Sequence, residues 1–317
     1  MGKIQIISGS AHPRLARQIC SYLKIKLTPV QIEHFADGEI YVKIKNKVRG
    51  DDVFIIQSMA PPINDHLMEL LIMIDALKRA SADRINVVCP YLCYSRQERK
   101  ASSREPISAK LVADLITKAG ATRLLTVDLH ADAIQGFYDI PVDHFVGYPK
   151  FVEYLEKKKY KDLVVVSPDV GGMKRGRAMA KLLNVPLAVI DKRRPRKNRA
   201  EVLAIIGEIK NKTCIVLDDI IDTAGTISNV TQVLKDRGAK EVIICATHAL
   251  FSGEACKKIN GCPASKVLLL DTLPLAKEKQ SEKVEIISLA KLFSKIIRRI
   301  HSGRSLGALF DWESKIK

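Results

Sequence analysis

Two adjacent acids and a small-residue turn form the segment of this chain with the clearest chemical meaning. Asp218 and Asp219 follow the apolar run 213–217, and the turn Asp222-Thr-Ala-Gly-Thr226 comes next. A turn that leads from a strand into a helix points backbone N–H groups and the positive end of the helix dipole at one place, which favours a phosphate monoester. The acids would face sugar hydroxyls or a metal ion at the carboxyl end of the strand. The segment therefore predicts a cradle for a sugar phosphate.

The elements that position this turn can be predicted from the hydrophobic spacing around it. Residues 213–217 suit a buried parallel strand, and residues 227–234 have helical spacing. The turn lacks the Gly-Lys-Ser/Thr of a P-loop and does not match Gly-x-Gly-x-x-Gly, so its ligand need not be a nucleotide. The alternative is that Asp222 and Thr226 only cap the helix while the paired acids are solvated.

Short apolar segments alternate with longer amphipathic segments along the whole chain, which predicts an α/β protein with mainly parallel sheets. The expected strands are 4–8, 53–57, 85–88, 123–127, 163–167, 187–191, 213–217, 242–247 and 266–270. This number of strands suits two doubly wound sheets better than one.

A faint internal repeat supports a division into two halves. Segments 52–91 and 213–248 share a strand-helix-strand pattern, but the first has Ser58-Met-Ala-Pro-Pro-Ile-Asn64 where the second has the acidic turn. The first half is therefore not expected to bind a sugar phosphate. We expect two domains, residues 1–146 and 147–317, with the last segment packing back on the first domain.

The composition is that of a globular protein with an excess of positive charge. The chain has 317 residues, of which 47% are hydrophobic, and a formal net charge of +17 at pH 7. Such a charge suits nucleic acid, a membrane surface or a polyanionic small substrate. Aromatic residues make up only 5%, which argues against a base-stacking surface. Acids interrupt the hydrophobic runs and the seven cysteines form no Cys-x-x-Cys pair, so we expect no membrane span, no export and mostly reduced thiols.

Further polar segments lie near the expected strand ends. Phe35-Ala-Asp-Gly-Glu-Ile-Tyr-Val-Lys43 is typical of a hairpin. Residues 90–106 form a basic stretch that suits anionic phosphates or is simply an exposed loop. His130 could ligate a metal or meet a phosphate oxygen, although a lone histidine is more often a structural donor. The basic run Lys192-Arg-Arg-Pro-Arg-Lys-Asn-Arg199 is either a flap over a ligand or a nucleic-acid patch.

Together these segments resemble the ribose-phosphate pyrophosphokinases of the phosphate-dependent class. The resemblance covers nearly the whole chain, and its motifs include Ile6-Ile-Ser-Gly-Ser10, Asn64-Asp-His-Leu-Met-Glu-Leu-Leu71, Asp128-Leu-His130, Ser167-Pro-Asp-Val-Gly-Gly172 and Thr247-His-Ala-Leu-Phe-Ser-Gly253. It implies two tandem phosphoribosyltransferase-type doubly wound domains with mainly parallel sheets. It also implies a ribose-phosphate diphosphokinase, which transfers the β,γ-pyrophosphoryl group of ATP to the C1 hydroxyl of ribose 5-phosphate and releases AMP.

The same resemblance implies roles for individual residues. The catalytic pair matches Lys192 and Arg194. The ATP site matches Phe35, Asp37, Gly38, Glu39, Arg96 and Gln97. The ribose 5-phosphate site matches Arg194, Asp218, Asp219, Asp222, Thr223, Ala224, Gly225 and Thr226. His130 and Asp169 match the metal site, for which Mg²⁺ is the expected cofactor, and an allosteric region matches Arg49, Ser103, Arg104, Gln135 and Ser305.

The resemblance extends to partners and location. ATP and ribose 5-phosphate are the expected substrates, and phosphate and ADP are the expected effectors. The relatives form hexamers in which the Phe35 segment reaches a neighbouring subunit, so a homo-oligomer is expected here. We expect no nucleic-acid partner, no membrane association and a cytoplasmic location.

Three alternative functions stay open at this point. A catalytically silent regulatory homologue would keep the fold, but the intact Lys192, Arg194, His130 and Asp169 argue against it. A phosphoribosyltransferase would use the same cradle, but that function would not explain the second full-length α/β half of the chain. A nucleic-acid-binding protein would account for the charge, and its affinity would fall steeply with salt.

Overall fold

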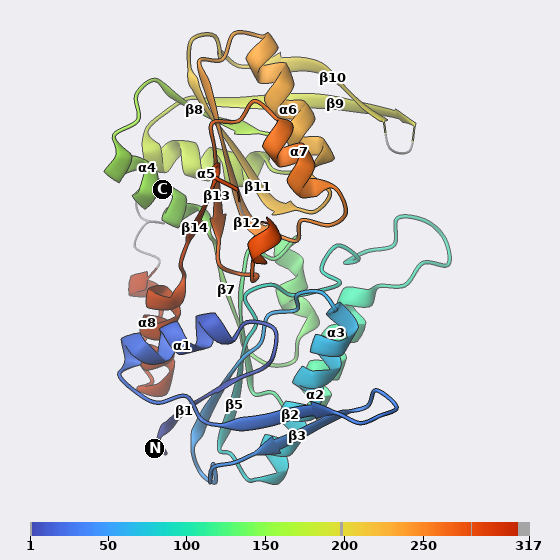
Figure 1. The fold of residues 1–317 in the computed structure, drawn as a ribbon, viewed down its shortest axis with the longest axis vertical. Helices are drawn as coiled ribbons and strands as arrows, with labels where there is room; N and C mark the ends of the chain where they lie inside the picture. The colour runs from blue at the N-terminus through green and yellow to red at the C-terminus, as the bar shows by residue number, and fades with distance from the viewer. Residues whose placement is uncertain (1, 197–198, 280, 310–317) are drawn as a thin grey trace. The chain divides into compact units, whose positions relative to one another are not determined.

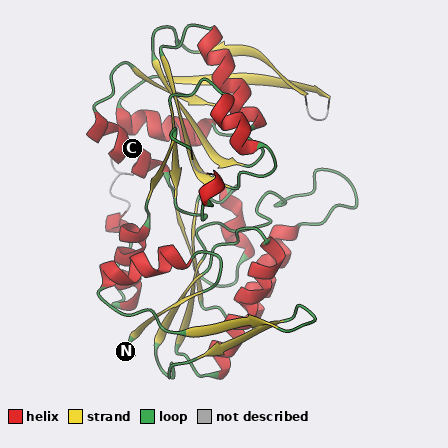
Figure 2. Ribbon diagram, in the orientation of Figure 1, coloured by secondary structure: helices red, strands yellow, loops and turns green. Residues whose placement is uncertain are grey.

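The computed structural model describes residues 2–196, 199–279 and 281–309 of the chain. These residues form two compact units. The first holds the chain up to Phe145 with the short returns 272–274 and 289–306, and the second holds 146–271 and 275–288 and continues from Gly307. Figure 2 shows helices beside the strands in both units.

The first unit is built on a five-stranded sheet with the order β1-β4-β5-β6-β7, and every neighbouring pair is parallel. The strands are β1 (Ile4–Ser8), β4 (Asp52–Ile56), β5 (Arg84–Val88), β6 (Arg123–Val127) and β7 (Val142–Phe145). The central strands are continuous apolar runs because helices cover both of their faces. Figure 1 shows α1 (Pro13–Leu23) and α8 (Ala290–His301) on one side of the sheet and α2 (Ile63–Arg79) and α3 (Ser108–Ala119) on the other.

Two smaller elements complete the first unit. An antiparallel hairpin of β2 (Val30–His34) and β3 (Ile40–Ile44) packs on α2, and a short 3-10 helix η1 (Asp132–Phe137) precedes β7. The hairpin confirms what the Phe35–Lys43 segment predicts. Proline sets the start of α1, since its fixed φ suits a first helical turn, and Nδ1 of His12 accepts the N–H of Leu15 at 3.4 Å.

The second unit contains a seven-stranded sheet with the order β10-β9-β8-β11-β12-β13-β14, in which only β10 is antiparallel to its neighbour. The strands are β8 (Leu163–Ser167), β9 (Leu187–Arg196), β10 (Arg199–Ile206), β11 (Thr213–Ile221), β12 (Glu241–Ala249), β13 (Lys266–Leu270) and β14 (Val284–Ile287). The helices are α4 (Tyr148–Lys158), α5 (Met173–Leu183), α6 (Gly225–Asp236), α7 (Ala255–Gly261), η2 (Lys277–Lys279) and η3 (Gly307–Leu309). In Figure 1, α4 and α5 lie on one side of this sheet, and α6 and α7 lie on the other.

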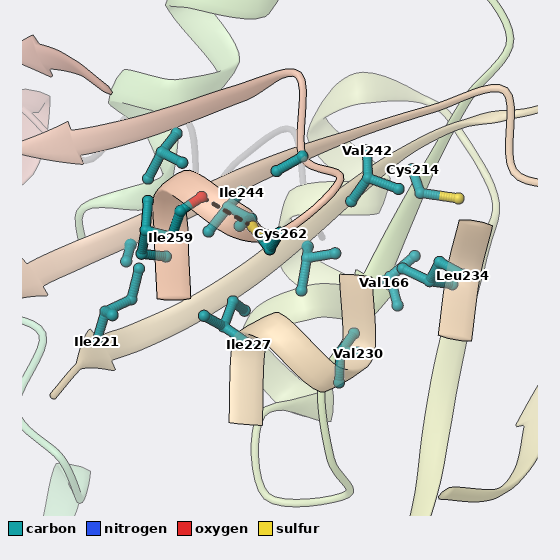
Figure 3. Packing of buried hydrophobic residues seen from close by; sticks show 14 of the residues in the cluster. Val166, Cys214, Ile221, Ile227, Val230, Leu234, Val242, Ile244, Ile259 and Cys262 are labelled. Carbon is teal, nitrogen blue, oxygen red and sulfur yellow. Dashed lines mark hydrogen bonds between the residues drawn. The ribbon is translucent and has the colours of Figure 1, made fainter. Parts of the chain in front are cut away.

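The core of the second unit forms where β8, β11 and β12 meet α6 and α7. Figure 3 shows Val166, Val242 and Ile244 facing Val230 and Leu234 of α6. Cys262 belongs to the same cluster and donates its thiol to the carbonyl oxygen of Ile259 at 3.2 Å. All seven cysteines are free thiols, as the sequence predicts. Burial raises the pKa of the Cys214 thiol to about 11, so little reactive thiolate forms there.

The strand order confirms the internal repeat. In the first unit β1, β4, β5, β6 and β7 follow one another across the sheet, and β8, β11, β12, β13 and β14 do the same in the second. Each unit also inserts a hairpin at the same place in the chain, β2–β3 before β4 and β9–β10 before β11. The two units are therefore two versions of one doubly wound α/β plan.

The first unit braces its strand-end loops with a buried carboxyl group. Glu69 of α2 is only 2% exposed and accepts hydrogen bonds from the N–H of Ser10 at 2.7 Å, its Oγ at 2.6 Å and Nε2 of Gln57 at 2.8 Å. Gln57 in turn accepts the N–H of Ala11 at 3.2 Å. The loop after β1 and the end of β4 are thus held from inside the protein.

Replacing Glu69 by alanine should strongly destabilise the fold. The free energy of unfolding is expected to fall by about 2–4 kcal/mol, because each buried donor left without an acceptor costs about 1–3 kcal/mol. Denaturant unfolding measures the loss. The matched control is Asp75→Ala on the same helix, whose pairing with Arg79 is exposed and should matter much less. An equal fall in the free energy of unfolding of the two variants would show that the hydrogen bonds to Glu69 do not stabilise the fold.

Candidate active site

The acidic pair lies inside a strand rather than just after one. The expected strand ends at Leu217, whereas β11 continues through Ile221 and pairs Asp218 with Ala246 and Ile221 with Ala249 of β12. The expected end was wrong because Ile220 and Ile221 resume the apolar pattern and β12 extends alongside them. Asp218 and Asp219 are therefore held by the rigid sheet.

The turn after β11 leads directly into a helix. Ala224 adopts a left-handed backbone with φ of 58° and is the N-cap of α6, which begins at Gly225. Alanine offers no side-chain acceptor to the first helical turn, so N–H groups of that turn remain for an outside anion. The N-cap position is not occupied by Asp222 or Thr226, which weakens the reading that they only cap the helix.

The paired acids face a basic partner from α5. Nη1 of Arg175 lies 3.5 Å from Oδ1 of Asp219, which is 7% exposed. Asp218 accepts the N–H of Asp219 at 2.9 Å. Burial raises the pKa of the Asp218 carboxyl well above its usual range, and the charges of Asp219 and Asp169 add to this, while Arg175 lowers it. Negative charge exceeds positive charge in this group of side chains.

Asp169 reaches the acidic group from the loop between β8 and α5. Its Oδ1 accepts the N–H of Gly172 at 3.0 Å, and its carbonyl oxygen accepts a hydrogen bond from Ser167 at 2.7 Å. A Cβ on Gly172 would lie 2.9 Å from Oγ of Ser167, so a side chain there would have to displace the hydroxyl that bonds the Asp169 carbonyl. Asp169, Asp218 and Asp219 thus belong to one unit, and the charge of Asp169 acts on the Asp218 carboxyl.

Two basic residues near this group were not singled out by the sequence. Arg175 follows Lys174 and precedes Arg177, and no local pattern distinguishes it from these neighbours. Nζ of Lys258, in α7, lies 4.0 Å from the position that a Cβ on Gly225 would occupy. Both depend on contacts between segments far apart in the chain, which spacing alone does not reveal.

The basic run after residue 191 is part of a hairpin. The expected strand 187–191 continues in the structure as β9 to Arg196 and pairs antiparallel with β10, for example Lys192 with Val202. It extends further than expected because β10 supplies a pairing partner. The backbones of Lys192 and Arg194 lie in β9, and their side chains lie outside the described part of the chain.

The hairpin of the first unit carries four of the residues expected at the ATP site. Its turn is closed by the N–H of Phe35, which donates to the carbonyl oxygen of Glu39 at 2.8 Å, and Gly38 takes a φ of 97° that favours glycine. Asp37 accepts the N–H of Glu39 at 3.0 Å. Phe35 is 53% exposed and meets Tyr41 edge to face, with ring centroids 5.8 Å apart.

The other residues expected at the ATP and metal sites lie on loops of the first unit. Arg96 and Gln97 are exposed in the long loop between β5 and α3, and Ala109 donates its N–H to the carbonyl oxygen of Gln97 at 3.3 Å. His130 is exposed just beyond the end of β6. Among the described residues, no group of three or more His, Cys, Asp or Glu side chains is arranged to hold a metal ion.

The residues expected in the allosteric region lie on separate segments of the first unit. Arg49 follows β3, Ser103 and Arg104 belong to the loop before α3, Gln135 is in η1, and Ser305 follows α8. Arg299 donates to the carbonyl oxygen of Ser305 at 2.6 Å, which ties this end of the chain to α8.

Comparisons with known proteins identify the family of this chain. Residues 4–120 match the N-terminal domain of ribose phosphate pyrophosphokinase, and residues 192–311 match the phosphoribosyl synthetase-associated domain. A ribose-phosphate pyrophosphokinase of Caldanaerobacter subterraneus subsp. tengcongensis is 51% identical over 97% of this chain and 98% of its own length. One from Bacillus subtilis is 48% identical over 97% of both chains.

A solved structure extends the similarity to the fold. The crystal structure of phosphoribosylpyrophosphate synthetase from Mycobacterium smegmatis superposes with a TM-score of 0.90 at 43% identity, covering 95% of this chain and 99% of that one. These proteins are 43–51% identical to this chain over 95–97% of its length. This chain belongs to the ribose-phosphate pyrophosphokinase family.

Proposed function

We propose that this chain transfers the β,γ-pyrophosphoryl group of ATP to the C1 hydroxyl of ribose 5-phosphate, which yields phosphoribosyl pyrophosphate and AMP. The observation that supports this most is the 51% identity, over almost the whole chain, to a ribose-phosphate pyrophosphokinase. The carboxyl groups near the end of β11 suit sugar hydroxyls, and the backbone N–H groups at the start of α6 suit a phosphate.

Ribose 5-phosphate binds in the second unit under this proposal. The turn Asp222–Thr226 holds the 5-phosphate through backbone N–H groups at the start of α6, where the helix dipole is positive. Lys258 adds a positive charge beside Gly225. Asp218 and Asp219 accept hydrogen bonds from the ribose hydroxyls, which orients the C1 hydroxyl toward ATP.

Magnesium is the proposed cofactor. Asp169 carries a carboxylate, the kind of oxygen donor that this hard cation prefers. We assign Asp169 and His130 to the metal by the family pattern. When bound, magnesium neutralises charge on the ATP phosphates.

Lys192 and Arg194 act on the transferred group. Negative charge builds up on the phosphate oxygens and on the departing AMP during the reaction, and two cations positioned there lower the barrier. Arg194 also contacts the ribose 5-phosphate.

Adenine stacks on Phe35, which is already exposed on the β2–β3 hairpin, beside Asp37, Gly38 and Glu39. Arg96 and Gln97 line the other side of the nucleotide.

The proposal includes assembly and control. We infer a homo-oligomer, a hexamer, in which the β2–β3 hairpin contributes to a neighbouring active site. Phosphate and ADP are the proposed effectors, acting through Arg49, Ser103, Arg104, Gln135 and Ser305. We propose residues 1–146 and 147–317 as the two domains, with the last segment packing back on the first domain, and the cytoplasm as the location. In the described part of the chain, no helix is long and apolar enough to cross a bilayer.

A direct assay tests the proposal. Purified protein is incubated with ATP, magnesium and ribose 5-phosphate over a range of phosphate concentrations, and AMP is measured with and without the sugar. Sugar-dependent AMP, with the pyrophosphoryl group found on C1, is the expected result. A folded protein that forms no AMP at any phosphate concentration would favour the catalytically silent homologue.

Gly225→Ala separates a binding role of the turn from a structural one. The added Cβ would meet nothing nearer than Nζ of Lys258 at 4.0 Å, and alanine suits a helix, so the unfolding midpoint should not fall. The methyl group would however occupy the place where a phosphate approaches the backbone. We expect the KM for ribose 5-phosphate to rise while the KM for ATP changes little.

The control for this variant is Gly261→Ala at the end of α7, where an added Cβ also meets nothing within 4 Å. Its KM for both substrates should stay that of the unaltered protein. An unchanged KM for ribose 5-phosphate in Gly225→Ala would rule out close approach of the phosphate to this turn.

A further inference from the structure

His144 joins two segments of the first unit that the proposed function uses separately. It lies in β7, which pairs with β6, and its side chain is 7% exposed. One neighbouring segment is the turn Asp128–His130, which carries the proposed metal and nucleotide residue. The other is η1, which carries Gln135 of the proposed effector region.

The imidazole of His144 extends the pairing of β6 with β7. The N–H of Asp128 donates to the carbonyl oxygen of Phe145 at 2.8 Å. The next N–H, that of Leu129, donates to Nε2 of His144 at 3.0 Å. A backbone N–H only donates, so Nε2 is the acceptor in this bond. A side chain thus supplies the acceptor at the point where the backbone ladder has ended.

This bond acts on a turn that needs support. Asp128 has a φ of 41°, a left-handed conformation that is rare for residues other than glycine and persists only when its surroundings hold it. Leu129 is buried, whereas His130 is exposed directly after it. The hydrogen bond to His144 and the burial of Leu129 therefore fix the direction in which His130 leaves the sheet.

The second nitrogen of the same ring faces η1. The side-chain amide of Gln135 lies 3.3 Å from Nδ1 of His144 and donates to the carbonyl oxygen of Asp132 at 3.0 Å. The carboxylate of Asp132 is 3.9 Å from Nδ1. Because Nε2 accepts, Nδ1 of the neutral ring carries the proton and faces the carboxylate of Asp132 in η1. Groups that support a ligating residue in this way commonly matter nearly as much as the ligating residue itself.

We propose that His144 is a positioning residue for nucleotide binding, which holds the Asp128–His130 turn through Leu129 and is itself packed against Asp132 and Gln135 of η1. The proposal rests on the role of His130 in the proposed function. It predicts an effect on ATP and magnesium that does not extend to ribose 5-phosphate, whose proposed site is built from residues of the second unit.

The test compares His144→Leu with His144→Gln in the full chain. Glutamine can place an acceptor oxygen near the position of Nε2, which leucine cannot. We expect kcat/KM for ATP, with magnesium in excess, to fall by about 10- to 100-fold in His144→Leu, the range typical of lost supporting contacts. His144→Gln should recover most of that loss, and the KM for ribose 5-phosphate should stay unchanged in both. Gln135→Ala, an exposed position, should shift kcat/KM for ATP in the same direction to a smaller extent.

Hydrogen exchange measured by mass spectrometry supplies a readout that does not need turnover. A peptide covering residues 126–131 should exchange slowly in the unaltered protein and in His144→Gln, and faster in His144→Leu. Equal exchange and equal kinetics in the leucine and glutamine variants would overturn the proposal, as would an equal rise in the KM of both substrates. If His144→Leu does not fold, an unchanged kcat/KM for ATP in Gln135→Ala overturns it. Absence of AMP formation by the unaltered protein would refute the proposed function instead, while the exchange data still report the hydrogen bond.

Discussion

Lys192→Ala should lower kcat by about 10²- to 10³-fold, the loss typical when one preorganised group that stabilises transition-state charge is removed. The lysine is proposed to meet charge that appears only as the pyrophosphoryl group leaves AMP. Binding of the ground-state sugar should therefore change little, so the KM for ribose 5-phosphate should stay near its original value. Steady-state rates of AMP formation, measured against both substrates, give the two constants.

Arg193→Ala is the matched control for this variant. It removes one positive charge from the same basic run of β9, at a position that does not match the catalytic pair. If the run acted only as a general positive patch, the two variants would lose similar activity. Near-normal turnover in Lys192→Ala would remove this residue from the mechanism.

Arg175→Leu and Asp219→Asn should each raise the KM for ribose 5-phosphate by about 10- to 100-fold. Hydrogen bonds to charged groups are worth about 1.5–3 kcal/mol, and each 1.4 kcal/mol is about tenfold in affinity. The two side chains are 19% and 11% exposed and 3.5 Å apart, so removing one leaves the other with an unbalanced charge. Asp219 would then lose the orientation that suits the ribose hydroxyls.

A double-mutant cycle tests whether this pair acts as one unit. The double variant should cost clearly less than the sum of the two single variants, because both remove the same interaction. Arg177→Leu, an exposed arginine on the same helix, controls for the loss of a positive charge. Additive effects of Arg175→Leu and Asp219→Asn, or an equal effect of Arg177→Leu, would show that Arg175 does not position Asp219.

Local patterns predict most of the sheet framework. The expected strands 4–8, 123–127, 163–167 and 266–270 agree with β1, β6, β8 and β13 residue for residue, because each is a short apolar run bounded by polar residues. The unpredicted strands β7, β10 and β14 are short or lie at sheet edges, and β14 is only partly buried. Pairing with a neighbour, which a single segment does not encode, makes them strands.

The same limit applies to the site. The turn Asp222–Thr226 stands out in the sequence because its residues are adjacent and their chemistry follows from their order. Arg175, Lys258 and His144 do not stand out, since each acquires its meaning from a contact made across the fold. The extension of β11 through the acidic pair was likewise missed, because acids are poor strand formers unless a neighbouring strand holds them.

The shared strand order of the two units has an evolutionary consequence. Both units place a hairpin before the second strand of the shared order and a junction after it. In the first unit the junction after β4 is closed around Glu69, while in the second the junction after β11 is a turn into α6. The β2–β3 hairpin forms a sheet of its own, whereas β9–β10 extends the main sheet, so the five strands common to both plans serve as the shared scaffold. New ligand preferences in this architecture can therefore arise by exchanging a hairpin, with no redesign of either core.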